Sequence, residues 1–502
     1  MRLLQGSQRD YTLTRWLFLR ALGLVYLFAF GSLAMQIIGL LGSNGILPAG
    51  NFLKSIASIY PAPDRYLLLP TLAWINSSNA FLQFLCIGGV ILALLLIFDI
   101  ATIPVLALLW VFYLSLVNIG QDFLAFQWDI LLLEVGFLAI FLAPFHLLPR
   151  VSRQRAPSLV VIWLFRWLLF RLMFSSGVVK LASGDPNWHN LTALSYHYWT
   201  QPLPTPLAWV MAQLPLWFMK ASTAFTFVVE LVVPFLFFMP RRIRFVGGLL
   251  TVMLQILILL TGNYTFFNWL TLVLCIPLFD DDALRRFFPR RLLQRMGDIH
   301  QRPPSIVKRV IVIPLAAVLL FVSGLRLLNL LDPRISPGNL PPALAQVYER
   351  ASGLYLTNGY GLFAVMTTTR PEIIIEGSKD GQTWLPYEFP YKAGDVNRLP
   401  SYVAPLQPRL DWQMWFAALG DYNSNPWFVS LIHRLLQGSP DILALLAYNP
   451  FPDAPPTYIR AQLYQYQFTD LAEHNSTGAW WKRKLVGAYL PALSLKNFNP
   501  QS

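Results

Sequence analysis

The sequence predicts an all-α bundle of about nine transmembrane helices, followed by a smaller, soluble α+β domain that is rich in β-strands. Three observations predict this fold class. Of the 502 residues, 55% are hydrophobic and only 13% are charged, a composition that does not fit a soluble chain of this length. Apolar runs long enough to cross a bilayer recur as far as residue 331. Beyond residue 332, proline, tyrosine and polar residues replace the aliphatic runs, as is typical of a soluble domain.

The predicted transmembrane segments are apolar runs of about 20 residues, the length that crosses a bilayer. In chain order they are residues 16–41, 80–98, 103–118, 130–146, 158–182, 222–240, 245–262, 265–279 and 309–331. The two cysteines, Cys86 and Cys275, fall inside these runs, where a thiol behaves as a small apolar group. We therefore expect neither a disulfide framework nor a cysteine-based metal site.

Arginine clusters set the predicted orientation. They precede the first segment, separate the fourth from the fifth and the sixth from the seventh, and follow the eighth. With nine crossings all these clusters lie on one side, which the positive-inside rule makes cytoplasmic. We expect a cytoplasmic N-terminus, a first segment retained as a signal anchor, and a C-terminal domain on the exterior side. The same topology accounts for the net charge of +13, so no nucleic-acid partner is expected.

The chain is predicted to divide into a multi-pass transmembrane domain (residues 1–332), a linker (333–341) and an exterior, β-rich domain (342–502). In the exterior domain, residues 372–376 and 384–391 flank a Ser-Lys-Asp-Gly turn, which predicts a hairpin whose proline-containing second run is an edge strand. The other elements expected there are helices at 411–419 and 426–437, a strand at 458–468, and a solvated basic end at 480–484.

The fifth predicted segment carries three cations, Arg166, Arg171 and Lys180. A charge at membrane depth is costly and is either paired or functional. A rise of about 1.5 Å per residue puts Arg171 at a depth similar to that of Glu230, and Lys180 at a depth similar to that of Glu134. We therefore expect these two ion pairs, and we expect Arg166 to bind lipid phosphate or backbone carbonyls.

A loop rich in Trp, His, Tyr and Pro follows Lys180 and is predicted to form an exterior site with it. The candidate site residues in this loop are Asp185, Trp188, His189, His197 and Gln201. The spacing of the two histidines matches no zinc motif, so no metal is expected. No serine lies in a GxSxG elbow and no phosphate-binding glycine motif is present, so we expect neither hydrolase chemistry nor a cofactor.

Four long blocks carry a family resemblance: SGVVKLASGDPNWHNLTALSYHYWTQPLP, TGNYTFFNWLTLVLCIPLFDD, MTTTRPEIIIEGSKDG and YVAPLQPRLDWQMWFAAL. They resemble the signature blocks of the lipase maturation factor family over most of the chain, from about residue 15 to 468. The resemblance implies a multi-pass membrane protein that assists exported proteins to fold. In the animal branch, it implies a protein of the endoplasmic reticulum needed by certain secreted lipases, with the C-terminal part in the lumen. The compact length and the lack of exterior cysteines instead favour a bacterial inner membrane.

A second resemblance concerns the membrane part alone. Residues 177–181 (GVVKL) followed by Trp188 are similar to the membrane domain of vitamin-K-dependent carboxylases, in which a lysine serves as catalytic base. The resemblance implies that Lys180 could act on a lipid, quinone or peptide. A lysine can do so only if desolvation or a neighbouring cation lowers its pKa towards neutrality. The alternative for Lys180 is snorkelling or an ion pair.

Two blocks of the exterior domain suit either a structural ion-pair network or a client-binding surface. Their residues are Arg370, Glu372, Glu376, Arg409, Asp411 and Trp412. The structural interpretation is favoured, and the exposure of Trp412 and Trp415 decides between the two. Four glycosylation sequons begin on the predicted exterior side, at Asn76, Asn190, Asn263 and Asn475.

Two hypotheses follow from the sequence. The first is a membrane-embedded maturation factor, with the lipid bilayer and an exported, lipase-like client as its partners. The second is a membrane enzyme that uses Lys180. The first is favoured, so the chain is not expected to be an enzyme.

Overall fold

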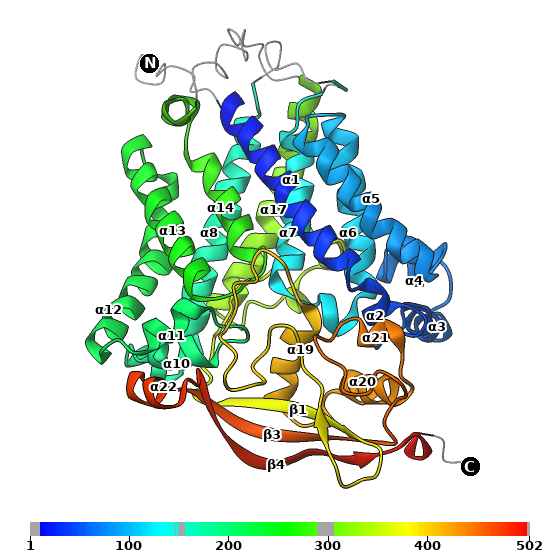
Figure 1. Ribbon diagram of the computed structural model, residues 1–502. Helices are drawn as coiled ribbons and strands as arrows, with labels where there is room; N and C mark the ends of the chain where they lie inside the picture. Colours follow the sequence, from blue (N-terminus) through cyan, green and yellow to red (C-terminus); the bar gives the residue numbers. More distant parts are fainter. Residues whose placement is uncertain (1–10, 146, 149–155, 289–305, 499–502) are drawn as a thin grey trace.

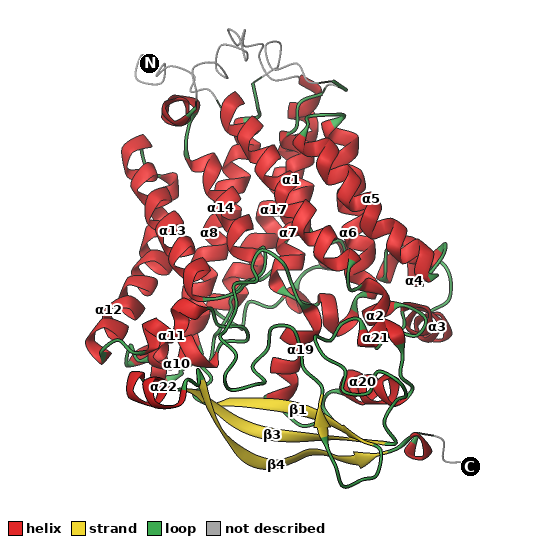
Figure 2. Ribbon diagram, viewed as in Figure 1, coloured by secondary structure: helices red, strands yellow, loops and turns green. Residues whose placement is uncertain are grey.

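The structure, a computed structural model, describes residues 11–145, 147–148, 156–288 and 306–498. It is a bundle of long helices with a β-sheet at one end (Figures 1 and 2). Most of the basic clusters that predict the orientation lie outside the described residues. The helix α1 begins at the end of the bundle opposite to the sheet (Figure 1).

Among the described residues, seven helices are long and apolar enough to cross a membrane. They are α1 (Thr12–Ala34), α5 (Asn79–Ile97), α6 (Thr102–Ile119), α8 (Leu159–Ala182), α13 (Arg241–Thr261), α17 (Ile306–Leu331), and the continuous run from α12 (Leu216–Phe227) through η5 (Val228–Val232) and η6 (Val233–Phe238). The remaining two predicted segments are also helical but shorter. They are α7 (Gln127–Leu142), and α14 (Phe267–Cys275) with η7 (Ile276–Leu278). The predicted multi-pass bundle is therefore confirmed, with nine as an approximate count.

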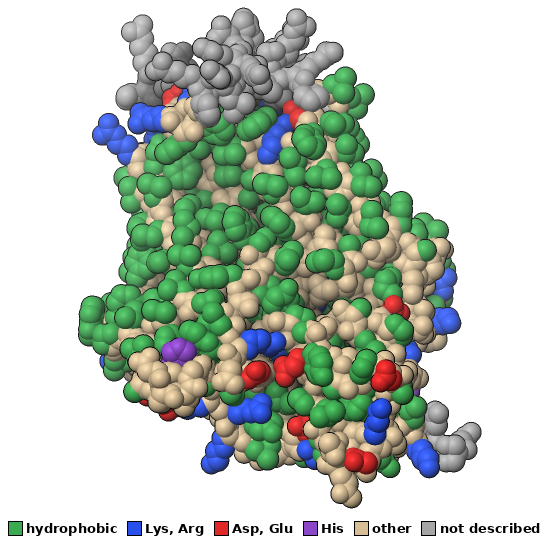
Figure 3. Space-filling model, viewed as in Figure 1, with side chains coloured by type: hydrophobic (Ala, Val, Ile, Leu, Met, Phe, Trp, Pro, Cys, Tyr) green, Lys and Arg blue, Asp and Glu red, His purple; other side chains and the backbone are tan. Residues whose placement is uncertain are grey.

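Hydrophobic side chains cover the flank of the helical part, whereas charged side chains gather at the sheet end and at the far end (Figure 3). The spans with the most exposed faces are α5, α13, α17 and the run that begins with α12, which leave most of their residues outside the protein core. Such faces are stable in contact with lipid acyl chains. Cys86 and Cys275 are both buried and unbridged, which agrees with their prediction as small apolar residues.

Short elements join the long helices. They are α2 (Ile37–Leu41), α3 (Ala49–Ile59), α4 (Asp64–Leu68), η2 (Leu72–Trp74), η3 (Gln121–Leu124), α9 (Pro186–His189), α10 (Ala193–Thr200), α11 (Pro206–Ala212), α15 (Asp281–Leu284) and η8 (Arg285–Phe287). Of these, α10 and α11 lie at the sheet end, beside α12 and α13 (Figure 1).

The C-terminal part holds a four-stranded antiparallel sheet in the order β2-β1-β3-β4. Its elements are η9 (Pro337–Asn339), α18 (Pro342–Gly353), β1 (Arg370–Ser378), β2 (Leu385–Pro386), α19 (Arg409–Ala418), α20 (Pro426–Leu436), α21 (Pro440–Leu443), β3 (Tyr458–Phe468), α22 (Leu471–Thr477), β4 (Trp481–Leu493) and η10 (Leu495–Asn497). The predicted hairpin, its edge strand, the strand β3 and both helices are present. Gly438, just beyond α20, has φ +64°, a backbone conformation that glycine adopts without strain.

Residues 480–484 were predicted as a solvated end with two anchoring tryptophans; the side chains of 482–484 are exposed as expected, but residues 481–484 also begin a strand that was not predicted. Trp481 is buried and begins β4, which pairs along the length of β3. The following lysines and arginine alternate poorly with apolar residues, so the period of two that identifies a half-buried strand is missing. Pairing with β3 supplies the backbone hydrogen bonds instead.

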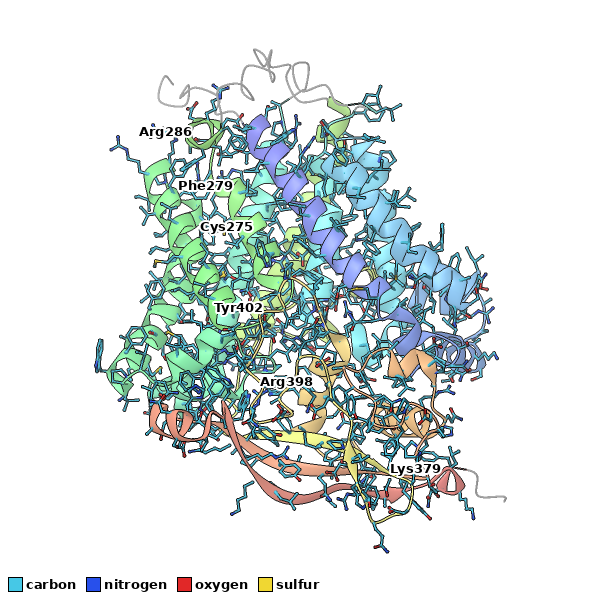
Figure 4. The ribbon with its side chains drawn as sticks, in the orientation of Figure 1. Cys275, Phe279, Arg286, Lys379, Arg398 and Tyr402 are labelled. Carbon is cyan, nitrogen blue, oxygen red and sulfur yellow. The ribbon has the colours of Figure 1, made fainter. Side chains whose placement is uncertain are left out.

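Segments of the C-terminal part penetrate the helical bundle and share its hydrophobic core. The loop around Tyr402 lies among the helices, with Arg398 closer to the sheet (Figure 4). Asn263, after α13, holds this loop: its Oδ1 accepts from the backbone N–H of Val403 at 2.7 Å and its Nδ2 donates to the carbonyl of Ser401 at 2.8 Å. Asn263 is 2% exposed, so it is a structural anchor and its sequon is inaccessible in this fold.

Candidate functional site

The candidate site is a cavity of about 430 Å³ at the sheet end of the bundle, lined by residues of α8, α10, α12, α13 and α14. Among the predicted site residues, Lys180, Trp188 and His197 line it together with Glu230. Cavities of this size are typical of small-molecule sites. The cavity therefore unites part of the predicted loop site with a buried ion pair.

Close packing of two helices brings Lys180 to Glu230. A Cβ atom on Gly177 would lie 2.7 Å from Leu231, so only glycine lets α8 approach η5 this closely. Glu230 lies in the π-helical turn η5, four residues before Pro234. Proline has no N–H and its ring clashes with the carbonyl four residues earlier, which explains why the α-helix widens there. Widened turns of this kind are frequent at functional sites.

Lys180 forms a complete set of hydrogen bonds. Its ammonium lies 2.8 and 2.7 Å from the two carboxylate oxygens of Glu230 and donates to the carbonyl of Ser176 at 3.1 Å. The ring of Trp188 covers the ammonium, 5.3 Å from its centroid. An ammonium has three donors, and all three are used. Every donor of Lys180 is therefore held by the protein, as in a structural ion pair.

The expected pairing of the membrane charges is wrong in its partners. The structure pairs Lys180 with Glu230 and Arg171 with Glu134, whereas depth along straight helices predicted the reverse. Depth alone ignores which faces of the helices meet, and the close approach at Gly177 decides the pairing. Arg166 donates to the carbonyl of Pro277 at 3.2 Å, in agreement with the predicted backbone contact.

Arg171 and Glu134 lie in a buried network that includes the C-terminal part, beside a second cavity of about 340 Å³ that is lined by Arg171, Asn358 and Tyr360 but not by Glu134. The other oxygen of Glu134 accepts from the backbone N–H of Asn358 at 2.9 Å and from the hydroxyl of Tyr360 at 2.7 Å. Arg171 also donates to the carbonyl of Asn358 at 3.1 Å. Local sequence patterns could not predict these partners of Glu134, because they lie more than 220 residues away in the chain.

His197 belongs to a hydrogen-bonded chain whose proton positions can be assigned. The amide Nε2 of Gln201 donates to the carbonyls of Tyr198 and Thr261, so its Oε1 must accept from the hydroxyl of Tyr264, 2.9 Å away. The Tyr264 oxygen then accepts from Nε2 of His197 at 2.8 Å. Burial, with the Lys180 ammonium as a second cause, lowers the pKa of His197 to about 4. The imidazole is therefore neutral at pH 7, with a bare lone pair on Nδ1.

The other predicted loop residues do not line the cavity. Asp185 caps α9 and accepts from the backbone N–H of Met366 at 2.6 Å, which ties the loop to the C-terminal part. Gln201 orients Tyr264, and His189 is exposed. In the described part of the chain, no three metal-ligating side chains come together. Sequence reasoning missed Tyr264, Asn268 and Gln255, although polar residues within the largely apolar stretch at 255–271 were a usable signal.

The interpretation of the exterior residues as a binding surface is wrong for most of them. Arg370, Glu372, Arg409, Asp411 and Trp412 are at most 3% exposed, and Trp415 is 6% exposed. Glu376 alone of the six is half-buried, and it pairs with Arg460 at 2.8 Å. The structural interpretation is therefore the one that the burial supports.

Two of these buried residues connect the C-terminal part to the bundle. Arg409 pairs with Asp129 of α7 at 2.8 Å, and Tyr113 of α6 donates to the same carboxylate at 2.5 Å. Arg370 pairs with Glu372 and donates to the backbone carbonyls of Trp199 and Pro202, each at 2.9 Å. The second of these contacts fixes the loop between α10 and α11.

The fold and the site define a multi-pass membrane protein whose C-terminal part is built into its helix bundle beside an intramembrane cavity. Comparison with known proteins identifies the family. Residues 13–286 match the model of the lipase maturation factor transmembrane domain, and residues 356–491 match that of the lipase maturation factor C-terminal domain. The chain belongs to the lipase maturation factor family, as the sequence blocks predicted.

Curated relatives align over nearly the whole chain. Lipase maturation factor 2 of Gallus gallus is 39% identical, and the alignment covers 96% of this chain and 81% of the relative. Lipase maturation factor 2 of Xenopus laevis is 38% identical, with 97% of this chain and 83% of the relative covered. Lipase maturation factor 1 of Homo sapiens is 36% identical, with 98% of this chain and 89% of the relative covered. No solved structure matches the chain. These comparisons give no support to the carboxylase alternative.

Proposed function

We propose that this chain is a membrane-embedded maturation factor that assists exported lipases to reach their active form. The observation that carries the proposal is the match to proteins named lipase maturation factor over at least 96% of the chain in the three relatives described. The paired, fully bonded Lys180 supports this function over lysine-based catalysis. The protein would act by binding its client rather than by chemistry on it.

The client would bind at the sheet end, on β4. Leu485 and Val486 are 52% and 62% exposed on this strand, next to the basic run at 482–484. β4 pairs with β3 and ends the sheet order β2-β1-β3-β4, so its outer edge offers backbone groups to an extended peptide. Exposed apolar side chains on a sheet edge are suited to a client that has not finished folding.

The test is a maturation assay in cells that lack their own lipase maturation factor. The chain is co-expressed with a secreted lipase, and lipase activity per mole of lipase protein is measured. We expect activity to rise with the wild-type chain and to fall with the double substitution Leu485→Glu and Val486→Glu. The matched control is Phe287→Glu, because Phe287 is 84% exposed and adjoins Arg286, which lies at the opposite end of the bundle (Figure 4). No rise with the wild-type chain would refute the proposed function.

The sheet end would face the exterior, which in a eukaryotic cell is the lumen of the endoplasmic reticulum. The relatives described are vertebrate proteins, which favours this membrane over the bacterial inner membrane that the sequence suggested.

Arg286 and Lys379 are exposed at opposite ends (Figure 4), and both native cysteines are buried. In sealed vesicles with the cytoplasmic face outside, an impermeant maleimide should label Arg286→Cys and spare Lys379→Cys. The reverse pattern would invert the topology.

A further inference from the structure

The cavity beside Lys180 opens towards the membrane. Its lining includes three exposed residues, Ala221 of α12 and Leu257 and Leu260 of α13. Both helices belong to candidate membrane spans with mostly unburied faces. The mouth is therefore apolar and lies where lipid acyl chains contact the protein. A ligand that enters there comes from the bilayer and carries an apolar chain.

The inner wall of the cavity is polar but carries no net charge among its described residues. Lys180 and Glu230 neutralise each other in a two-oxygen ion pair, and His197 is neutral at pH 7. Bringing an ionic head group into such a wall would leave its charge without a partner, which is costly in a low-dielectric site. The wall therefore favours an uncharged head group.

Two buried atoms in the wall indicate what that head group must offer. Within the described part of the chain, Nδ1 of His197 and Oδ1 of Asn268 have no hydrogen-bond partner. Both residues line the cavity. In the assigned proton arrangement both atoms are acceptors, since Nε2 of His197 carries the ring proton and Nδ2 of Asn268 donates to Gln255 at 2.7 Å. A ligand must therefore donate hydrogen bonds, and hydroxyl groups do so without charge.

We propose that this cavity binds a neutral, hydroxyl-bearing lipid, such as a monoacylglycerol, with its hydroxyls on His197 and Asn268 and its acyl chain leaving between α12 and α13. The inference goes beyond the maturation role and does not depend on it. The lipid would separate the polar wall from the hydrocarbon of the bilayer. It would also contact α12, α13 and α10, the helix that carries His197.

The test is equilibrium binding of radiolabelled 1-oleoylglycerol to the full-length protein in detergent. We expect one saturable site per chain. Unlabelled methyl oleate has the same acyl chain but no hydrogen-bond donor. It should compete at least 10-fold more weakly than unlabelled 1-oleoylglycerol, because a loss of one to two buried hydrogen bonds weakens binding by about that factor. Oleate at pH 8.5 should also compete weakly. Equal competition by methyl oleate, or stronger competition by oleate, would overturn the proposal.

Variants locate the site. Ala221→Trp should abolish binding because the indole fills the mouth, whereas Val228→Trp, an exposed position of the same run that does not line the cavity, should bind as the wild type does. His197→Gln keeps a donor for Tyr264 and removes the Nδ1 acceptor, so it should weaken binding about 3- to 10-fold. Wild-type affinity in Ala221→Trp would place the lipid elsewhere. If Ala221→Trp does not fold, His197→Gln and the ligand series decide the question, and unchanged affinity in His197→Gln would refute the proposed head-group contact.

Discussion

Two buried ion pairs lie on the same helix, nine residues apart, and they differ in what surrounds them. Around Arg171 and Glu134, Asn358 and Tyr360 of the C-terminal part hydrogen-bond to the pair, and only Arg171 of the two charges lines the neighbouring cavity. Around Lys180 and Glu230, the protein leaves a cavity that opens between α12 and α13. The comparison shows that a charge at membrane depth has two uses. A pair that is hydrogen-bonded to the C-terminal part fastens segments together, whereas a pair of which both members line a cavity shapes a site.

The largest effect is expected at the Arg171–Glu134 pair. Glu134→Gln leaves the Arg171 guanidinium buried without a counter-charge and weakens the hold on Asn358. Removal of one partner from a buried pair costs about 3–5 kcal/mol, so the variant should be scarce in membranes and should unfold at lower temperature in detergent. Glu134→Leu with Arg171→Met removes both charges and should recover part of the loss. An unchanged melting temperature in Glu134→Gln would show that this network does not stabilise the contact between the helix bundle and the C-terminal part.

A smaller effect is expected at the cavity pair. Lys180→Met leaves the Glu230 carboxylate beside a cavity that can admit water, so the cost should be about 1–3 kcal/mol, that of one incompletely solvated polar group. The measurement is again the melting temperature in detergent, compared directly with Glu134→Gln. Lys180→Met with Glu230→Gln serves as the control without charges. Equal destabilisation by Lys180→Met and Glu134→Gln would remove the distinction between the two pairs.

The next effect is a pH dependence that originates in the cavity wall. The folded pKa of His197, about 4, lies below the ordinary value of 6.5, so its contribution to stability is complete above pH 6.5 and is lost as the pH falls towards 4. Between pH 7.5 and 5.5 this amounts to about 1 kcal/mol. The titratable groups that line the cavity together with His197 are Lys180, Tyr198, Glu230 and Tyr264. The wild type should lose more stability over this range than His197→Gln.

The difference between the two proteins, rather than the slope of either, is the quantity to measure. Asp411 is buried in α19, and burial raises its pKa to about 6. Its contribution has the opposite sign, because stability from the protonated acid is lost as the pH rises through 6. Asp411 is common to both proteins and cancels in the difference. Identical slopes for the wild type and His197→Gln would contradict the assignment of His197 as a buried neutral base.

The smallest effect is expected at the other loop histidine. His189 is exposed at the end of α9, so His189→Ala should change the free energy of unfolding by less than about 0.5 kcal/mol and leave lipid binding unchanged. His189→Ala tests whether the effects of His197→Gln are specific to the cavity, because His189 does not line it. A loss of binding in His189→Ala would extend the site to the exposed surface.

The sequence predicted the class of the fold because apolar length and composition report on the bilayer directly. It also predicted the hairpin, whose turn residues are local, and the helix that ends before Gly438. It placed Lys180, Trp188 and His197 in one candidate site because they are close in the chain. It could not predict the partners of Glu134 and Arg409, which are fixed by contacts across more than 220 residues. It misplaced the ion pairs because helix rotation and the glycine contact at Gly177, not depth, select partners.

The distance along the chain between Glu134 and Asn358 has a consequence for synthesis. Glu134 is synthesised 224 residues, and Arg171 187 residues, before Asn358, which hydrogen-bonds to both. Until Asn358 has been synthesised, the Glu134 carboxylate and the Arg171 guanidinium lie in an incomplete helix bundle. The bundle therefore matures only when its last third has been translated and inserted, and a chain that stops early leaves an incomplete network in the membrane. A protein proposed to assist the folding of others thus has a late, vulnerable step in its own.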